Sequence, residues 1–473
     1  MLTKALNISL ILTLIFYFNN YAQNYNDALR LEFPGLGSNA RALGMGNAFN
    51  ALSDDASAAY FNPAGFGLLK KLEFSGGLNI VSINNKSTLY GNKTEGSTTN
   101  TTLNRVSFAF PFPTYQGSLV FGLSYHKSKD LSNIIKFDGF NSGAHSKIQS
   151  LLDSDIPFNL FLTDEDNNTI INGNLNQSGD ILNSGSIDNW TFSGAIEVQK
   201  NFFIGGNLNV ASGNFESTYD FFEDDTKNIY QGETAPGEPQ TRDFLTFNFN
   251  NRINWDISGW DAKLGFLYQY QDVMRIGATV QFPKSFTIEE EYSELVSSEF
   301  GTGQYYEVTY NDKVKYSILT PFELTGALAY NFRGLILSAD VTYIDYPQMK
   351  FEKAEGFSNP DEFITSQNKL IKDKLTAVIN FNVGFEYTVP NIGLRLRGGF
   401  LNQPSAFKGD SQAFNRKFIT AGIGFLTDGS IGIDLGYAYG WWKDIGDNYG
   451  VNLSRTFQEI KLHNVMVTTT YRF

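Results

Sequence analysis

The sequence predicts an all-β protein, a transmembrane antiparallel β-barrel of about 14 strands with an N-terminal plug, or hatch, in its lumen. Three observations predict this fold. Apolar side chains alternate with small or polar ones along many segments, short and long connections alternate between those segments, and the chain stops on an aromatic residue of such a segment. The composition agrees, because aromatic residues make up 15% of the chain and proline only 13 of 473 residues, which favours strands.

Residues 1–22 are expected to be a secretory signal peptide. Lys4 supplies the positive charge, 5–18 the apolar stretch, and cleavage is predicted before Gln23. The alternative is an uncleaved anchor helix, although the apolar stretch is short for a full membrane span. No later stretch has the roughly 18 continuous apolar residues that a transmembrane helix needs.

Residues 23–71 are predicted to form the plug. The segment 35–65 is rich in Gly, Ala and Ser, and glycine permits close backbone approaches that larger residues forbid. Ser53, which precedes two aspartates, is expected to cap a helix. The motif Asn62–Pro63–Ala64 is expected to end the segment, because Pro63 disfavours the α conformation at Asn62. The alternative is a short helical linker.

Residues 72–473 are predicted to form the barrel, with long extracellular loops. Between 431 and 441 every second residue is apolar or aromatic, and the residues between are Gly, Asp or Ala. In a soluble sandwich the apolar face would fill a core, whereas in a membrane barrel it meets lipid. The predicted strands are 72–88, 103–111, 116–129, 187–199, 202–222, a long bent strand ending near 271, 273–290, 316–332, 335–351, 374–389, 392–402, 415–428, 430–443 and 462–473.

The connections favour the membrane barrel over the sandwich. Short turns alternating with long loops are typical of outer-membrane barrels, where the short turns are periplasmic. Tyr and Trp side chains at strand ends, such as Tyr268 and Trp441, suit the two membrane interfaces. The last strand, ending at Phe473, looks like the strand that the outer-membrane barrel assembly machinery recognises. The short turns are expected at 112–115, 200–201, 271–272, 333–334, 390–391 and Gly429.

Several functional classes are excluded or disfavoured. The chain has no cysteine, so disulfides and thiolate metal sites are excluded. The net charge of −13 argues against a nucleic-acid partner. The three histidines, His126, His145 and His463, lie far apart without a nearby catalytic motif. No enzyme activity, metal or cofactor is therefore predicted.

Three sets of residues carry a family resemblance. Gly44–Ala48 and Asp54–Ser57 lie in the plug, Asn62–Pro63–Ala64 closes it, and a hairpin follows at 259–283 with the arms KLGFLYQY and MRIGATVQFP. Together with a barrel of about 14 strands, these residues resemble the FadL family of long-chain fatty acid transporters. The hairpin departs from the family pattern at Asp261, where a small residue is expected.

The resemblance implies facilitated uptake of long-chain fatty acids or other hydrophobic small molecules across a Gram-negative outer membrane, gated by the hatch. In that family the ligand leaves sideways through a gap in the barrel wall. The strand 116–129 contains Gly117 and Gly122 but no proline, so the gap is implied by the resemblance alone. The implied partners are outer-membrane lipid, a hydrophobic small-molecule ligand and, during biogenesis, the barrel assembly machinery.

Two groups of residues are candidates for ligand binding. Arg395 and Arg397 face the lumen by alternation and would pair with a ligand carboxylate. The alternative is that they pair with an acid of the neighbouring strand, such as Glu386. The loop 130–186 contains an apolar cluster that forms either a binding surface or a packed sub-core. The candidates in this cluster are Ile148, Leu151, Leu152, Phe158 and Phe161.

A second function stays open. The long polar loops and the G-M-G-x-A-x-N-A-L form of the plug also suit an accessory subunit of an outer-membrane secretion or assembly complex. Other outer-membrane proteins would then be its partners.

Overall fold

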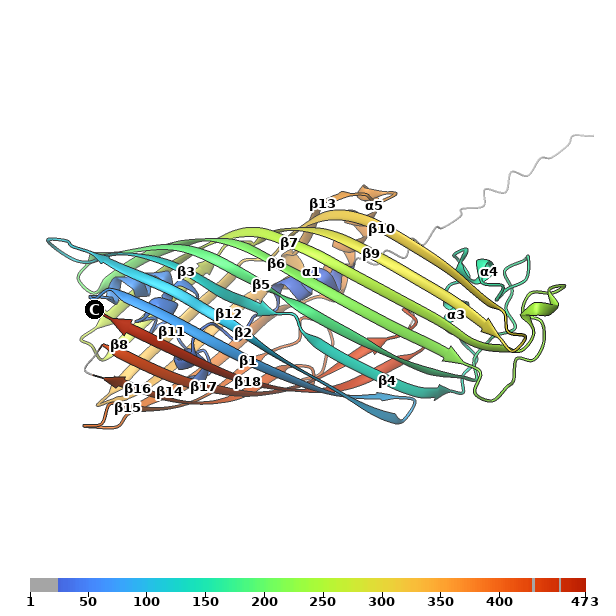
Figure 1. Cartoon of the computed structure of the whole chain (residues 1–473). Coiled ribbons are helices and arrows are strands. Elements are labelled where there is room, and N and C mark those ends of the chain that lie inside the picture. Colours follow the sequence, from blue (N-terminus) through green and yellow to red (C-terminus); the bar gives the residue numbers. More distant parts are fainter. Residues whose placement is uncertain (1–23, 428–429, 451) are drawn as a thin grey trace, which may run out of the picture.

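A computed structural model of the chain describes residues 24–427, 430–450 and 452–473. The predicted signal peptide, 1–22, and the predicted turn residue Gly429 lie outside the described residues. The strands form one antiparallel barrel around a lumen (Figure 1). The barrel is closed because the first strand pairs with the last, from Glu73 opposite Arg472 to Thr88 opposite Phe457.

The barrel wall has 14 passes, as the sequence predicts. Four passes are each divided into two strands, namely β3 with β4, β8 with β9, β10 with β11 and β12 with β13. The strands are β1 Glu73–Leu89, β2 Asn92–Phe112, β3 Leu119–Asp130, β4 Asn133–Asn141, β5 Leu175–Gln199, β6 Phe202–Asp224, β7 Phe244–Tyr270, β8 Met274–Gln281, β9 Ser285–Phe300, β10 Tyr305–Leu319, β11 Glu323–Phe332, β12 Leu335–Asp345, β13 Lys350–Glu355, β14 Ala377–Thr388, β15 Leu394–Gln403, β16 Arg416–Thr427, β17 Ile431–Asp447 and β18 Arg455–Arg472.

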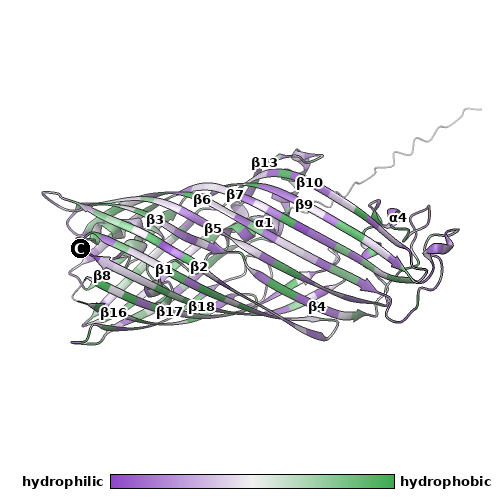
Figure 2. Cartoon of the chain, in the orientation of Figure 1, coloured by the Kyte–Doolittle hydropathy of each residue, from purple (hydrophilic) through white to green (hydrophobic). Residues whose placement is uncertain are grey.

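The apolar face of each pass points outward. Along β17, Ile431, Ile433 and Leu435 are exposed, whereas Gly432 and Gly436 are buried against the lumen. Hydropathy alternates along the strands in Figure 2. A closed barrel with such an exterior is an outer-membrane barrel of the Gram-negative type, as predicted. In the described part of the chain, none of the helices has the length and apolar character that a helical membrane crossing requires.

The two ends of the barrel differ. Short turns such as 200–201 and 333–334 lie at the end where the chain terminates, which is the periplasmic end (Figure 1). The loop with α3 and α4 lies at the other end. The expected long loops at 89–102 and 291–315 are wrong, because there the strands continue to tight turns at 90–91 and 301–304. The extension 92–104 is polar on both faces, and 291–315 turns apolar residues such as Val296 and Phe300 inward, so neither shows the apolar exterior that predicts a membrane pass.

The plug lies inside the barrel, where the sequence analysis expects it (Figure 1). Asn62 has extended backbone angles and begins η2, as its position before Pro63 implies. The expected helix cap at Ser53 is wrong by two residues, since Asp55 caps η1 and the Ser53 hydroxyl instead donates to Phe49 O. The helices are α1 Tyr25–Glu32, α2 Ala40–Gly44, η1 Ala56–Ala59, η2 Pro63–Leu68, α3 Lys147–Ser150, α4 Ile156–Asn159, η3 Pro239–Thr241, η4 Tyr346–Gln348 and α5 Pro360–Lys374.

Two large apolar clusters pack inside the barrel, one around the first helix of the plug and one toward the outer end. The first surrounds α1 and is covered by α5, whose Phe363 and Ile371 are fully buried in it. The second joins the loop with α3 and α4 to the outer parts of the strands, and it includes Phe137, Phe221 and Phe247. Within the described residues, much of the lumen at these two levels is therefore filled by packed apolar side chains.

Candidate functional site

The plug rests directly on the backbone of the barrel wall. A Cβ atom added to Gly384 would lie 2.0 Å from Met45 O, and one added to Gly399 would lie 2.3 Å from Gly46 N. A Cβ atom on Gly436 would meet Ala40 O at 2.4 Å. Real atoms do not approach so closely, so only glycine permits this contact. The small lumenal face of the strands thus serves to seat the plug.

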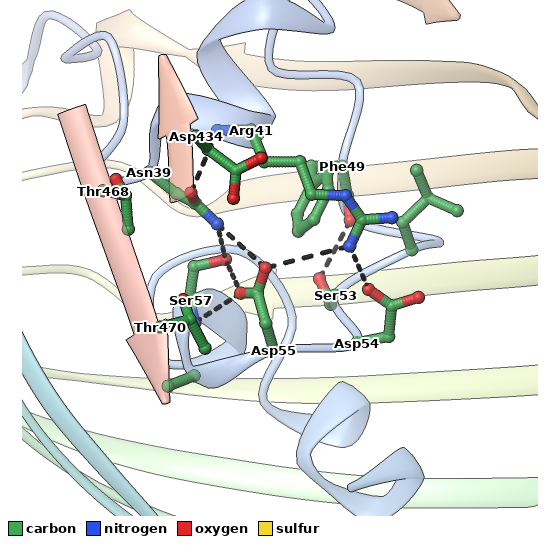
Figure 3. Close-up of polar contacts among 12 residues, drawn as sticks. Asn39, Arg41, Phe49, Ser53, Asp54, Asp55, Ser57, Asp434, Thr468 and Thr470 are labelled. Atoms are coloured by element: carbon green, nitrogen blue, oxygen red, sulfur yellow. Dashed lines mark hydrogen bonds and ion pairs between the residues drawn. The ribbon is translucent and has the colours of Figure 1, made fainter. Parts of the chain in front are cut away.

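A buried cluster of charges links α2 to the wall, and Figure 3 shows its part within the plug, where Arg41 faces Asp54 and Asp55. The Arg41 guanidinium donates to Asp54 Oδ1 at 2.5 Å and, through Nε, to Glu386 Oε2 at 2.8 Å. Asp54 also pairs with Arg275 of β8 at 3.0 Å. Burial alone would raise the pKa of Asp54, but the charges of Arg41 and Arg275 hold that pKa well below its ordinary value. Arg41 therefore connects two segments of the plug with β14.

A second polar group holds the same region of the plug together (Figure 3). The Asn39 amide donates to Asp55 Oδ2 and to the Ser57 hydroxyl, both at 3.0 Å. The backbone N–H of Ala40 donates to Thr468 Oγ1 on β18 at 3.0 Å. These bonds satisfy polar groups that burial would otherwise leave unpaired.

The predicted motif Asn62–Pro63–Ala64 fastens the end of the plug to β7. The Asn62 amide donates to Phe266 O and to Asn50 O, both at 3.0 Å, and its carbonyl accepts from Ala64 N at 3.1 Å. A Cβ atom on Gly265 would lie 2.1 Å from Asn62 Oδ1. This explains why the motif and the 259–283 hairpin occur together in the sequence, because one docks on the other.

An internal cavity of about 180 Å³ lies between the plug and the wall. Leu31, Phe33 and Tyr60 line it from the plug, and the wall contributes residues of β3, β5, β7, β8 and β14 among others. Three lysines reach it, namely Lys129, Lys263 and Lys284. Three carboxylates, Glu32, Asp261 and Glu323, also line it, so the cavity combines apolar surface with charges of both signs.

The same lysines bind the plug. Lys129 Nζ donates to Arg30 O at 2.9 Å and to Leu31 O at 2.7 Å, two carbonyls in the last turn of α1. Lys263 Nζ donates to Tyr60 O at 2.6 Å. Bonds to neutral carbonyls leave the charge of both lysines uncompensated by a direct carboxylate partner within the described residues.

Lys284 lies between two carboxylates, Glu32 of α1 at 3.1 Å and Glu323 of β11 at 2.6 Å. One ammonium group does not neutralise both acids. Burial raises the pKa of Glu32 to about 7, with Lys284 opposing and the Glu323 charge adding to the rise. The end of α1 is therefore held by a contact that changes its charge near neutral pH.

The wall is interrupted beside this cavity. The ladder between β2 and β3 begins at the periplasmic turn and ends where Arg105 faces His126. Above that point β3 shifts register against β5 between Lys127 and Lys129, and the pass resumes as β4 at Asn133.

Side-chain bonds replace the ladder across the interruption. Asn100 Nδ2 donates to Asp130 Oδ2 at 3.1 Å, and Asn92 Nδ2 donates to Asp138 O at 3.0 Å. The cavity is lined by His126, Ser128 and Lys129, so it reaches the wall where the ladder stops. We name this place, residues 92–104 of β2 against 127–136, the wall break.

Two of the five apolar candidates in the loop 130–186 pack in the second apolar cluster, the one toward the outer end of the barrel. Ile148 is fully buried there, and Leu151 packs against the cluster. Leu152 is half-buried, and Phe161 lies with its ring 4.4 Å from the ring of Tyr306. Phe158 is 50% exposed. The packed sub-core is therefore the correct alternative for Ile148, while ligand contact by Phe158 stays a prediction.

The two candidate arginines, Arg395 and Arg397, differ in burial and in contacts. Arg397 is fully buried, and its guanidinium lies 2.7 Å from Glu386 and 2.7 Å from Asp434. Arg397 therefore pairs with Glu386, which was the alternative raised from the sequence. Through Glu386, Arg397 belongs to the same charge cluster as Arg41. Arg395 is half-buried outside the cavity lining. The sequence analysis missed the lysines of the cavity because their spacing shows no pattern.

The described residues contain no group of His, Asp and Glu side chains that could hold a metal ion. Sequence comparisons add no assignment, because no family model matches the chain and no curated protein does.

Solved structures do match the whole chain. The toluene transporter TodX of P. putida aligns with a TM-score of 0.57 at 14% identity, over 93% of this chain and 99% of TodX. A FadL homologue of Pseudomonas aeruginosa aligns with a TM-score of 0.58 at 13% identity, over 93% and 99%. The chain has the FadL fold. The toluene transporter TbuX of Ralstonia pickettii aligns with a TM-score of 0.53 at 18% identity, over 94% and 100%.

Proposed function

We propose that this FadL-type barrel lets hydrophobic small molecules, long-chain fatty acids among them, cross the outer membrane and leave sideways through the wall break. The observation that carries the proposal is the position of the cavity. Its lining includes Ser128 and Lys129, where the main-chain ladder between β2 and β3 stops. A molecule in the cavity is thus separated from the lipid by side chains instead of a continuous hydrogen-bonded wall.

The seating of the plug supports a sideways exit. Backbone contacts at Gly384 and Gly399 and the Arg41 ion pairs fix the plug at the periplasmic side. Moving the whole plug would break all of these contacts together. Leaving through the wall requires only the segment 31–35 to shift, because that segment lies against β3. A Cβ atom on Gly35 would lie 2.2 Å from Ser128 O.

In this proposal the hatch therefore gates the exit by a local movement of the segment 31–35. Lys129 holds Arg30 O and Leu31 O, so releasing Lys129 would free the end of α1 beside the wall break. A ligand carboxylate is a stronger acceptor for an ammonium group than a carbonyl is. A fatty acid entering the cavity would compete for Lys129 and so favour the opening that lets it leave.

The chemistry of the cavity supports a molecule with a long apolar part and one acidic group. Leu31, Phe33 and Phe286 provide apolar surface. Lys129 and Lys263 offer ammonium groups bonded to carbonyls. Two of the neighbours named above are toluene transporters, so an aromatic hydrocarbon is the competing substrate.

Uptake measurements test the proposal. The chain is produced in a Gram-negative host that lacks its own fatty acid transporter, and uptake of labelled oleate and labelled toluene is compared with the empty host. We expect the chain to increase oleate uptake. Lys263→Gln should lower oleate uptake, whereas the exposed control Lys315→Gln should not. Correct insertion without any increase in either compound, together with a stoichiometric protein partner on purification in mild detergent, would favour the accessory-subunit function instead.

A further inference from the structure

A second cavity, of about 70 Å³, adjoins the plug segment 33–34. The loop 404–415 covers it, and residues of β16 and β17 line it. Phe33, Pro34 and Gln403 line both this cavity and the central one. The two cavities are thus neighbours that share one partition, and Phe33 with Pro34 forms the plug's part of it.

The second cavity reaches the outside. Lys443 and Asp410 line it and are both exposed. The outer end of the barrel, in contrast, is filled by the cluster that contains Phe221 and Phe300, both fully buried. Of the two cavities described, the one under the loop 404–415 therefore lies between the outer surface and the central cavity, from which the partition at Phe33 and Pro34 separates it.

The loop over this cavity is firmly attached. Thr376 N donates to Ala406 O at 2.8 Å, and Lys443 N donates to Ala413 O at 3.0 Å. Leu375 and Phe407 form an isolated bridge. The loop therefore makes a defined wall for the cavity.

Arg416 places a positively charged guanidinium group beside the aromatic rings of the cavity. Its guanidinium lies 4.2 Å from the centre of the Phe33 ring and 5.2 Å from that of Trp442. Within the described residues, no carboxylate lies at ion-pair distance from it. Of the two acids that line the cavity, Asp410 accepts from the Ser405 hydroxyl, whereas Asp444 accepts from Ile445 N and interacts electrostatically with Arg416 from beyond ion-pair distance.

The surrounding side chains are mostly aromatic. Tyr346, Phe407 and Phe414 line the cavity together with Phe33 and Trp442. The Phe33 ring packs edge-on against Tyr346 at 6.1 Å. Aromatic faces beside a guanidinium group bind molecules that have an apolar body and one anionic group.

We propose that this cavity is the entrance site, where a hydrophobic carboxylate binds Arg416 before it passes Phe33 and Pro34 into the central cavity. The proposal rests on the proposed function and adds the route by which the ligand arrives. The carboxylate pairs with the Arg416 guanidinium, and the chain packs on Phe33 and Trp442. Rotation of the Phe33 ring then joins the two cavities.

Fluorescence quenching tests the site. 11-Bromoundecanoate is added to the purified full-length barrel, and its bromine should quench Trp442, so Trp442→Phe should remove most of the quenching. Arg416→Gln should weaken binding about tenfold, and Arg416→Lys should weaken it less. The matched control is Arg242→Gln, since Arg242 is an exposed arginine whose partner is Glu233.

Uptake of the same compound tests the route. Ser405→Trp fills the cavity and should reduce uptake at least fivefold, whereas Ser411→Trp, at the exposed tip of the same loop, should not change it. Wild-type affinity in Arg416→Gln together with wild-type uptake in Ser405→Trp would overturn the entrance site and leave the proposed function standing. A wild-type barrel that takes up no 11-bromoundecanoate would overturn both.

Discussion

Replacing Arg41 tests whether buried charge holds the plug. Arg41→Met keeps the length of the side chain but removes the partner of Asp54 and Glu386. The side chains of Arg41 and Glu386 are 8% and 2% exposed, and breaking a buried pair costs about 3–5 kcal/mol. Asp54 keeps Arg275 and Glu386 keeps Arg397, so we expect the lower end of that range.

A loss of about 3 kcal/mol raises the population of undocked plug on the order of a hundredfold. Amide hydrogen exchange of peptides covering 40–60 measures this population. Arg30→Met is the matched control, because Arg30 belongs to the same plug but is 32% exposed in its pair with Asp27. Such a pair contributes at most about 1 kcal/mol.

The loss of plug stability in Arg41→Met should not depend on pH near neutrality. The pKa of Asp54 is depressed in the folded protein, so its contribution is present above the unfolded value and is lost only as pH falls through the folded value. Unchanged protection of 40–60 in Arg41→Met would refute the reasoning. It would mean that the glycine contacts alone hold the plug.

Two further predictions concern how the plug is seated and how its first helix responds to pH. Gly384→Ala places a methyl group against Met45 O and should destabilise the docked plug by about 1–3 kcal/mol, measured by the same hydrogen exchange. The control Gly326→Ala, with nothing within 4 Å of its Cβ, should change the stability of the docked plug by less than about 1 kcal/mol. Equal effects of the two substitutions would contradict the backbone contact at Gly384. Because the folded pKa of Glu32 is raised to about 7, its stabilising contribution is complete below the unfolded value and is lost as pH rises through 7. Protection of α1, corrected for intrinsic exchange, should therefore fall across that range in the wild type and stay constant in Glu32→Gln, and a pH-independent wild type would contradict this assignment.

Alternation along the chain was enough to predict the membrane passes. Where a strand has lipid on one side and the plug on the other, as at Leu435 and Gly436, the contrast between its faces is strong. Where a strand carries polar side chains on both faces, as at 92–104, that contrast is absent, and the sequence analysis expected a loop. The strand count was therefore predictable, while the height of the barrel above the membrane was not.

The functional site was less predictable because it depends on contacts between distant segments. Glycines in the strands indicated a small lumenal face, but only the structure shows Gly384 meeting Met45. No proline in the sequence indicates the wall break. The break arises where β3 shifts register beside Lys129 and the end of α1, and both depend on contacts between distant segments. Arg397 could be assigned to a ligand or to Glu386 on alternation alone, and only the distances decide.

The central claim is that molecules leave through the wall break, and a reversible cross-link tests it most directly. Asn100 and Asp130 touch across the break, and the chain has no other cysteine, so Asn100→Cys with Asp130→Cys can be bridged by oxidation or a short bis-thiol reagent. The control is Ser107→Cys with Ser124→Cys, a pair whose hydroxyls lie 2.6 Å apart in the intact ladder below the break. We predict that bridging the break abolishes oleate uptake, that reduction restores it, and that bridging the control changes nothing. Full oleate uptake through a barrel with the break bridged would contradict the account.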